Sequence, residues 1–204
     1  MIENDIDILK KLVKEDKGLT CIFGESATGK STFCLMSSIK EARKNNKVVF
    51  LDTEGSFSVE RIKQMNGKDC LDNILLMNIK NFREQQDQIK NLSLLSSKVS
   101  LIVIDTLTHH YRNLIRKKPE LARVMLLSQL RMLKKISEKI PVLITSQVYQ
   151  DINNNVQKPV GGGLLIKEVD NLIKLVKEPR KALLLKPERN HIYFRIENEG
   201  IFEN

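Results

Sequence analysis

Residues 24–31 read GESATGKS and match the pattern G-x-x-x-x-G-K-[ST] at each fixed position. The glycines let the backbone curl tightly, so that successive N–H groups and the start of a following helix can face phosphate oxygens. Lys30 adds a mobile cation, and the Ser31 hydroxyl can ligate Mg²⁺. The sequence therefore predicts a nucleoside-triphosphate site formed by Gly24, Glu25, Ser26, Ala27, Thr28, Gly29, Lys30, Ser31 and Thr32.

The segments on either side of this loop have the patterns that such a site needs. The apolar run 19–23 predicts a buried strand before the loop, and apolar residues at helical spacing follow it at Phe33, Met36 and Ile39. A chance glycine turn before a helix is the alternative. The match of eight residues, with a strand and a helix in register on its flanks, argues against that alternative.

Asp105 is the candidate second metal residue. It directly follows the aliphatic run 101–104, which predicts a buried strand. A carboxylate at this point would hold Mg²⁺ through bound water. Four aliphatic residues and an aspartate occur in many buried strands, so this motif alone is weak evidence. It indicates a metal residue because the chain also contains the phosphate-binding loop. We expect the metal site to comprise Ser31 and Asp105.

Two more polar residues follow expected strands. Glu54, after strand 47–51, could orient an attacking water toward the γ-phosphate; a surface turn acid is the alternative. Gln147 could hydrogen-bond to the γ-phosphate and report its presence to the following loop; a polar strand end is the alternative. Ligands in open α/β sheets lie beyond the carboxyl ends of the strands. We therefore expect one catalytic group of Glu54, Lys30 and Gln147.

Strands and helices alternate along most of the chain, which predicts a mainly parallel sheet flanked by helices. We expect helices at 5–15, 58–65, 82–95 and 121–139, and strands at 19–23, 47–51, 74–77, 99–104 and 142–145. Beyond residue 170 three strand-like runs are joined by short Pro-containing turns, which predicts an antiparallel edge at 172–176, 182–185 and 192–196. We expect one α/β domain over residues 1–204.

Length and composition limit the class of protein. The chain has 204 residues, of which 41% are hydrophobic and 29% charged, enough for a sizeable core. No apolar run approaches the roughly 18 residues of a membrane span, and the acidic, amphipathic start does not resemble a signal peptide. We expect a cytoplasmic protein without a membrane partner. The three cysteines lack C-x-x-C spacing and are expected to be reduced structural thiols.

The net charge of +9 is concentrated in one segment. Residues 105–140 hold nine Lys or Arg and three Asp or Glu, which leaves +6. Basic surfaces commonly bind polyanions such as nucleic acid. The alternative is a Lys-rich helix face that only keeps the protein in solution.

Five segments in this order resemble the RecA-type recombinases of archaea and eukaryotes. They are GESATGKS, DTEGSFSVERI at 52–62, IDTLTHHYR at 104–112, ITSQV at 144–148 and KPVGG at 158–162. The closing strings LLLKPER and YFRIENEGIFE are similar to the ends of these proteins. The resemblance covers roughly residues 19–204 and is greatest to a short archaeal paralogue of the family. It implies a RecA-like P-loop NTPase fold, with ATP and Mg²⁺ as cofactors.

The resemblance implies roles for the residues of the expected site. Glu54 matches the catalytic glutamate of the family, and Gln147 matches the sensor that couples the γ-phosphate to DNA. Lys30, Ser31 and Asp105 match the nucleotide and metal residues. In-trans contacts with the nucleotide of a neighbouring subunit would come from Lys186 and Arg189.

The resemblance also implies two DNA-facing loops. The first would open at residues 109–112, where Tyr111 could stack on a base or belong to the core. The second spans residues 148–163 and is rich in Asn and Gly. The cations that we expect to contact DNA are Arg112, Arg116, Lys117, Lys118 and Lys158.

The chain departs from the full recombinases at its start. About twenty residues precede the first strand, so we expect neither the helical N-terminal DNA-binding domain nor the Phe-x-x-Ala linker motif. Ser146 also replaces the usual Asn before the sensor. The resemblance therefore implies a DNA-binding accessory or mediator of homologous recombination and DNA repair, with weak ATPase activity and no strand exchange of its own. Its partners would be DNA and, by resemblance only, a recombinase, a Holliday-junction nuclease, a DNA polymerase subunit or further copies of the chain.

Two other functions remain open at this point. One is a non-hydrolysing, ATP-dependent switch that docks protein partners on the same fold. The other is a small-molecule phosphotransferase, although the sequence has no obvious Arg-bearing lid over the phosphates.

Overall fold

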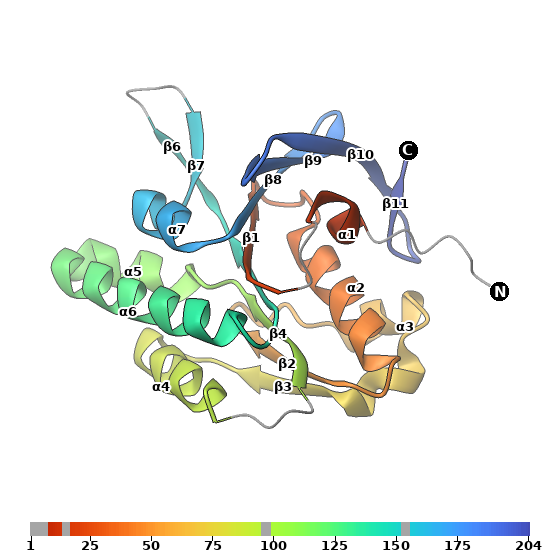
Figure 1. The fold of residues 1–204 in the computed structure, drawn as a ribbon, viewed down its shortest axis with the longest axis horizontal. Helices are drawn as coiled ribbons and strands as arrows, with labels where there is room; N and C mark the ends of the chain where they lie inside the picture. The colour runs from red at the N-terminus through yellow and green to blue at the C-terminus, as the bar shows by residue number, and fades with distance from the viewer. Residues whose placement is uncertain (1–7, 14–16, 95–98, 152–155) are drawn as a thin grey trace.

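A nine-stranded sheet crosses the molecule in the order β11-β10-β9-β8-β1-β5-β4-β2-β3 (Figure 1). The computed structural model describes residues 8–13, 17–94, 99–151 and 156–204. The six strands from β8 to β3 are mutually parallel. Their bounds, in sheet order, are Asn171–Lys177, Leu19–Gly24, Val142–Ser146, Val99–Asp105, Lys47–Asp52 and Ile74–Asn78.

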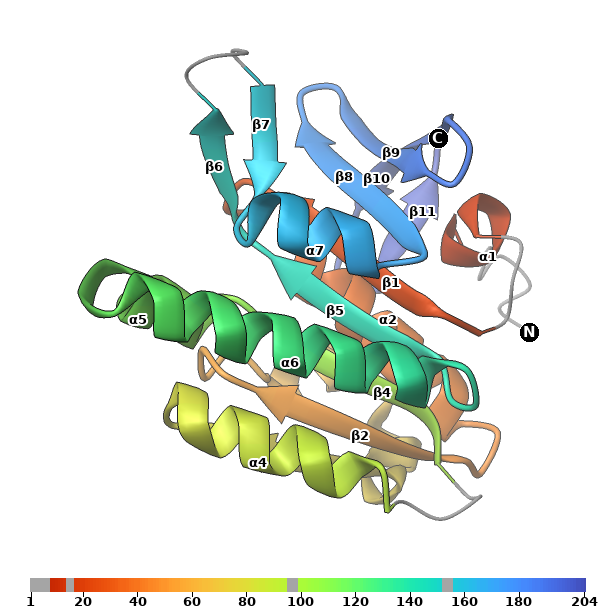
Figure 2. The ribbon, with the colours of Figure 1, turned by 60° about the vertical axis from the view of Figure 1, so that its left-hand side comes forward.

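Helices cover both faces of this sheet, because alternate residues of the central strands point to opposite sides. In β4, Ile102 and Ile104 join one core cluster, and Leu101 and Val103 join the other. The first cluster packs against α4 (Phe82–Leu92), α6 (Pro119–Ser137) and α7 (Gly162–Glu168) (Figure 2). The second packs against α1 (Ile8–Leu12), α2 (Lys30–Ala42) and α3 (Val59–Gln64).

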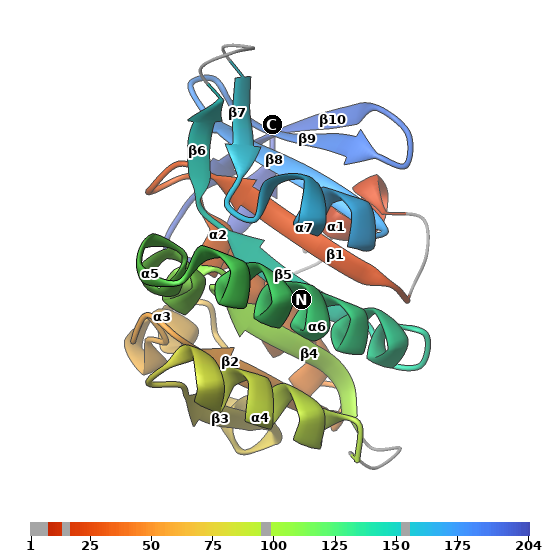
Figure 3. The same cartoon turned by 90° about the vertical axis from the view of Figure 1, so that its left-hand side faces the viewer.

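The carboxyl-terminal part of the sheet is antiparallel, as the sequence predicts. Strands β9 (Arg180–Lys186), β10 (Asn190–Ile196) and β11 (Ile201–Glu203) follow β8 in antiparallel pairing. A separate hairpin of β6 (Val148–Asp151) and β7 (Val156–Pro159) stands beyond the end of β5 (Figure 3).

Most of the expected elements are confirmed with shifted ends. Ser58 caps α3 as predicted, since its hydroxyl accepts a hydrogen bond from the Arg61 N–H at 3.1 Å. The expected helix 5–15 is confirmed only over 8–12, and the parts at 5–7 and 14–15 lie outside the described residues. The expected helix 82–95 ends at Leu92, and its last residue is not described.

The predicted first DNA-facing loop is wrong as a loop. Residues His109–Lys117 form a helix, α5, and α6 then begins at Pro119 rather than at residue 121. Tyr111 is buried, and Leu114 and Ile115 pack against the same core, so the segment is an amphipathic helix with an apolar side. Pro119 is compatible with the first turn of α6 because that position needs no N–H donor.

The predicted second loop also contains regular structure. It comprises the β6–β7 hairpin and the start of α7, and residues 152–155 lie outside the description. A short 3-10 helix, Lys68–Asn73, is a further element that the sequence reading missed. Cys21, Cys34 and Cys70 are free and buried, as expected. Within the described ranges no helix is long and apolar enough to cross a membrane.

Candidate nucleotide site and adjoining basic helix

The predicted phosphate-binding loop connects β1 to α2. Gly29 has φ +104°, and a Cβ there would lie 2.7 Å from Ile196 Cδ1, so both conformation and space favour glycine. The loop borders an open cavity of about 410 Å³. Glu54, Thr106, Gln147 and Val148 line the rest of that cavity. The structure thus brings the three expected catalytic side chains to one place.

Lys30 reaches back over the loop. Its Nζ donates hydrogen bonds to the carbonyl oxygens of Gly24 and Glu25, at 2.9 and 2.7 Å. Burial lowers the pKa of Lys30, whereas the nearby carboxylates of Asp105 and Glu54 act to raise it. An entering phosphate would offer this ammonium group acceptors with a full negative charge, which form stronger hydrogen bonds than backbone carbonyls.

Asp105 lies buried at the carboxyl end of β4. One carboxylate oxygen accepts hydrogen bonds from the Thr145 hydroxyl at 2.5 Å and from the Thr106 hydroxyl at 3.3 Å. The other oxygen lies 3.4 Å from the Ser56 hydroxyl. These hydroxyls fix the orientation of a carboxylate at the site where the sequence predicts the metal. Thr145 and Ser56 were not predicted, because their separation from Asp105 along the chain hides the contact.

The segment that carries Glu54 is held by Asp52, a buried residue at the end of β2. Its Oδ1 accepts hydrogen bonds from the backbone N–H groups of Glu54, Gly55 and Ser56, at 3.1, 2.9 and 3.1 Å. Its Oδ2 accepts a fourth from the Phe57 N–H at 2.8 Å. The sequence reading missed this positioning role, although an Asp two residues before the acid is a common turn signal.

We predict that Asp52→Ala lowers both stability and hydrolysis without weakening ATP binding. Four N–H groups lose a charged acceptor, which costs on the order of 1.5–3 kcal/mol, and Glu54 loses its fixed position. Asp52→Asn is the matched control, because it keeps one side-chain oxygen as an acceptor and should lie between the parent and the Ala variant. Thermal melting and ATP turnover check the prediction. A parental melting temperature and turnover for Asp52→Ala would contradict it.

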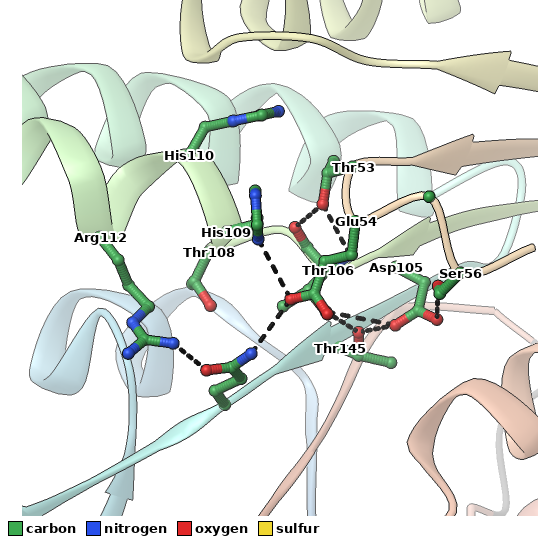
Figure 4. Close-up of polar contacts among 12 residues, drawn as sticks. Thr53, Glu54, Ser56, Asp105, Thr106, Thr108, His109, His110, Arg112 and Thr145 are labelled. Carbon is green, nitrogen blue, oxygen red and sulfur yellow. Dashed lines mark hydrogen bonds and ion pairs between the residues drawn. The ribbon is translucent and has the colours of Figure 1, made fainter. Parts of the chain in front are cut away.

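Gln147 connects Glu54 to helix α5. Its Nε2 donates to Glu54 Oε1 at 3.1 Å, and its Oε1 accepts a hydrogen bond from Arg112 Nη1. His109 Nδ1 lies 3.4 Å from the same Glu54 oxygen. Figure 4 shows Arg112 and His109 extending from α5 toward the strand ends where Glu54 lies. Glu54 is therefore part of a polar network, and Gln147 makes specific contacts on both sides.

The expected DNA-binding cations lie in two places. Arg112 is half-buried on α5, and Arg116, Lys117 and Lys118 are exposed at the end of that helix. Lys158 lies on the β6–β7 hairpin and forms an ion pair with Asp151 at 2.5 Å, which raises the pKa of Lys158. The hairpin also reaches the phosphate-binding loop, where Gln157 donates a hydrogen bond to Glu25.

Tyr111 belongs to the core. Its ring is 7% exposed and lies 6.1 Å from the Phe82 ring, centroid to centroid. Of the two alternatives that the sequence left open, the structure favours core packing over base stacking.

Lys186 and Arg189 lie near the amino end of β8, whereas the phosphate-binding loop follows the carboxyl end of the neighbouring strand β1. Lys186 pairs in register with Leu172 near the start of β8, and its Nζ donates to the Val169 carbonyl at 2.5 Å, at the end of α7. Arg189 is exposed in the β9–β10 turn. Their action on a neighbouring subunit stays a prediction. Arg180, which the sequence reading missed, does reach the loop, since its Nη1 donates to the Ala27 carbonyl at 3.2 Å.

The parallel sheet, the glycine loop between β1 and α2 and the acidic residues at neighbouring strand ends define the class of RecA-like P-loop proteins. A family model described as Rad51 matches residues 4–202, and the chain belongs to this family.

Among its relatives the similarity is to RadB proteins. The chain is 36% identical over 202 residues to the DNA repair and recombination protein RadB of Methanococcus maripaludis, with 92% of each sequence covered. It is 34% identical to the RadB protein of Thermococcus sibiricus, with coverages of 91% and 87%. A crystal structure of the RadB recombinase superposes with a TM-score of 0.77 at 30% identity, covering 95% of this chain and 94% of that one. The resemblance read from the motifs is confirmed.

Proposed function

We propose that this chain is an ATP-dependent DNA-binding protein of homologous recombination and repair. It acts as a RadB-like accessory or mediator, with weak ATPase activity and no strand exchange of its own. The observation that carries the proposal is the contact chain from Glu54 through Gln147 to Arg112, which joins the nucleotide cavity to the basic helix α5. The names of the RadB relatives, which refer to DNA repair and recombination, support the same assignment.

The donor set of the cavity fits ATP with Mg²⁺. Lys30 and Ser31 line the cavity, where Lys30 would supply a cation and the loop its backbone N–H groups for the phosphates. The Ser31 hydroxyl and the carboxylate of Asp105, a buried residue at the end of β4, would supply the oxygen ligands that Mg²⁺ prefers. Bound Mg²⁺ would neutralise phosphate charge. Glu54 would orient the attacking water, and Gln147 would contact the γ-phosphate.

DNA would bind mainly through its phosphates on α5 and the β6–β7 hairpin. Three neighbouring cations at the end of α5 are exposed, and Arg112 extends the set toward the nucleotide cavity. Phosphate contacts carry little sequence information, so we expect binding with weak sequence preference. We propose a cytoplasmic location, where the protein would have access to DNA.

We predict that changing Arg116, Lys117 and Lys118 together to Ala weakens DNA binding alike across sequences. Each phosphate contact contributes roughly 0.7–0.9 to the slope of log affinity against log salt, so the slope should flatten by about two units. The measurement is a salt titration of DNA affinity.

The matched control changes Lys63, Lys68 and Lys90 to Ala, which removes the same charge from exposed positions on α3, the 3-10 helix and α4. This control should keep the parental slope. If the α5 variant also keeps it, the basic run is only a solvated helix face.

A non-hydrolysing switch that docks protein partners is the second candidate function. The edge strand β3 favours it, because Leu75 and Leu76 are 54% and 37% exposed on that strand. Partners of this kind would include a recombinase, a Holliday-junction nuclease, a DNA polymerase subunit or a second copy of the chain. Turnover of ATP in the presence of DNA would decide against this candidate.

A further inference from the structure

Arg112 has a donor geometry that suits two competing acceptors. Its guanidinium donates to Gln147 Oε1, and the residue is half-buried at the start of α5, on the same helix as the exposed cations near its end. A guanidinium is a planar fork of five N–H donors and can bind two phosphate oxygens at once. A charged phosphate is a stronger acceptor than the neutral amide oxygen that Arg112 now holds.

Arg112 also fixes which way the Gln147 amide faces. The amide oxygen accepts a hydrogen bond from Arg112, and the amide NH₂ group donates one to Glu54. Turning the amide by half a turn would place its oxygen against the carboxylate of Glu54 and its NH₂ group against the guanidinium, and both contacts would be repulsive. While Arg112 stays in place, the favourable orientation of the Gln147 amide is therefore the one in which its NH₂ group donates a hydrogen bond to Glu54 Oε1.

We propose that Arg112 is a positioning residue that holds Gln147 against Glu54, and that a DNA phosphate competes with Gln147 for the Arg112 guanidinium. This inference rests on the proposed function, and it adds a way in which DNA binding would regulate ATP hydrolysis. When a phosphate binds Arg112, the Gln147 amide can turn toward the γ-phosphate. Glu54 Oε1 then keeps its contact with His109 Nδ1 but loses the hydrogen bond from Gln147, so that it can accept one from water. By linkage, a nucleotide that draws Gln147 away would release Arg112 for DNA.

The test is a double-mutant cycle on DNA affinity, measured without nucleotide on one single-stranded oligonucleotide at one salt concentration. The proteins are the parent, Arg112→Ala, Gln147→Ala and the double variant. Removing Gln147 removes the competitor, so Gln147→Ala should bind DNA about three- to tenfold more tightly than the parent. In the Arg112→Ala background the same change should have no effect.

A second readout separates positioning from general damage. Arg112→Ala should raise the DNA-free kcat for ATP severalfold, leave KM for ATP unchanged and abolish further stimulation by DNA. Arg83→Ala, an exposed arginine on α4, is the control for the loss of one charge. If Arg112→Ala melts early, Arg112→Met replaces it, because methionine removes the charge and the N–H donors and keeps a long side chain.

Equal effects of Gln147→Ala in both backgrounds, or a lowered DNA-free kcat in Arg112→Ala, would overturn the inference. Its failure differs from that of the proposed function. A parent that bound DNA and ATP but gave an additive cycle would overturn only the role of Arg112. A parent that bound neither would overturn the proposed function as well.

Discussion

Lys30→Ala is expected to weaken ATP binding about 10- to 100-fold, because the phosphates lose a charge-assisted hydrogen bond of roughly 1.5–3 kcal/mol. The ammonium group donates its hydrogen bonds to loop carbonyls, those of Gly24 and Glu25. These carbonyls lie beside an open cavity and can be solvated, so we expect the free energy of unfolding to change by about 1 kcal/mol or less.

Nucleotide titration and thermal melting of the same samples check this expectation. Lys63→Ala removes one exposed lysine from α3 and should match the parent in both measurements. Parental ATP affinity in Lys30→Ala would end the interpretation of residues 24–32 as a phosphate-binding loop.

Glu54→Gln is expected to lower ATP turnover on the order of a hundredfold or more, with ATP affinity retained. The amide is nearly the same size as the carboxylate but is a much weaker acceptor for the hydrogen of an attacking water. The contacts of Glu54 with Gln147 and His109 place it beside the cavity rather than in an isolated surface turn.

The measurement is single-turnover hydrolysis with saturating ATP and Mg²⁺, in the presence of DNA. Glu60→Gln changes an exposed acid in the first turn of α3 and is the matched control. Equal rates for the parent and Glu54→Gln would assign Glu54 to the turn alone, and turnover by neither would favour the switch function.

The sequence predicts most of the fold because the central strands β1, β2, β4 and β5 are buried on both faces. Continuous aliphatic runs such as 101–104 and the loop at 24–31 are local signals, and both are where the sequence places them. The antiparallel edge after residue 170 was likewise visible, because short runs alternate with Pro-containing turns. Local patterns therefore predict the elements, and the parallel crossovers follow from their alternation.

The sequence does not predict helix α5, because its many polar and charged residues obscure the helical spacing of its few apolar ones. Tyr111, Leu114 and Ile115 mark its apolar side among many charged residues, and the family resemblance implied a DNA-facing loop at this position. The hairpin of β6 and β7 was missed for a related reason. Its sequence is polar, and among the described residues its strands pair with each other and not with the main sheet.

Long-range polar contacts could not be read from the sequence at all. Asp105 and Thr145 are forty residues apart, and Arg112 and Gln147 thirty-five, yet each pair shares a hydrogen bond. These residues meet because the fold places neighbouring strand ends side by side, and the spacing of the residues along the chain does not indicate these contacts. Motifs predict roles for single residues, and those roles stay predictions, whereas the contacts between the residues required the structure.

The measurement that tests the central claim most directly is DNA affinity across a range of salt concentrations, with and without ATP and Mg²⁺. We predict that log affinity falls linearly with log salt and that ATP shifts the whole line, because the nucleotide cavity and helix α5 are joined through Gln147. Superimposable lines with and without ATP, or an affinity that does not change with salt, would contradict an ATP-dependent DNA-binding protein.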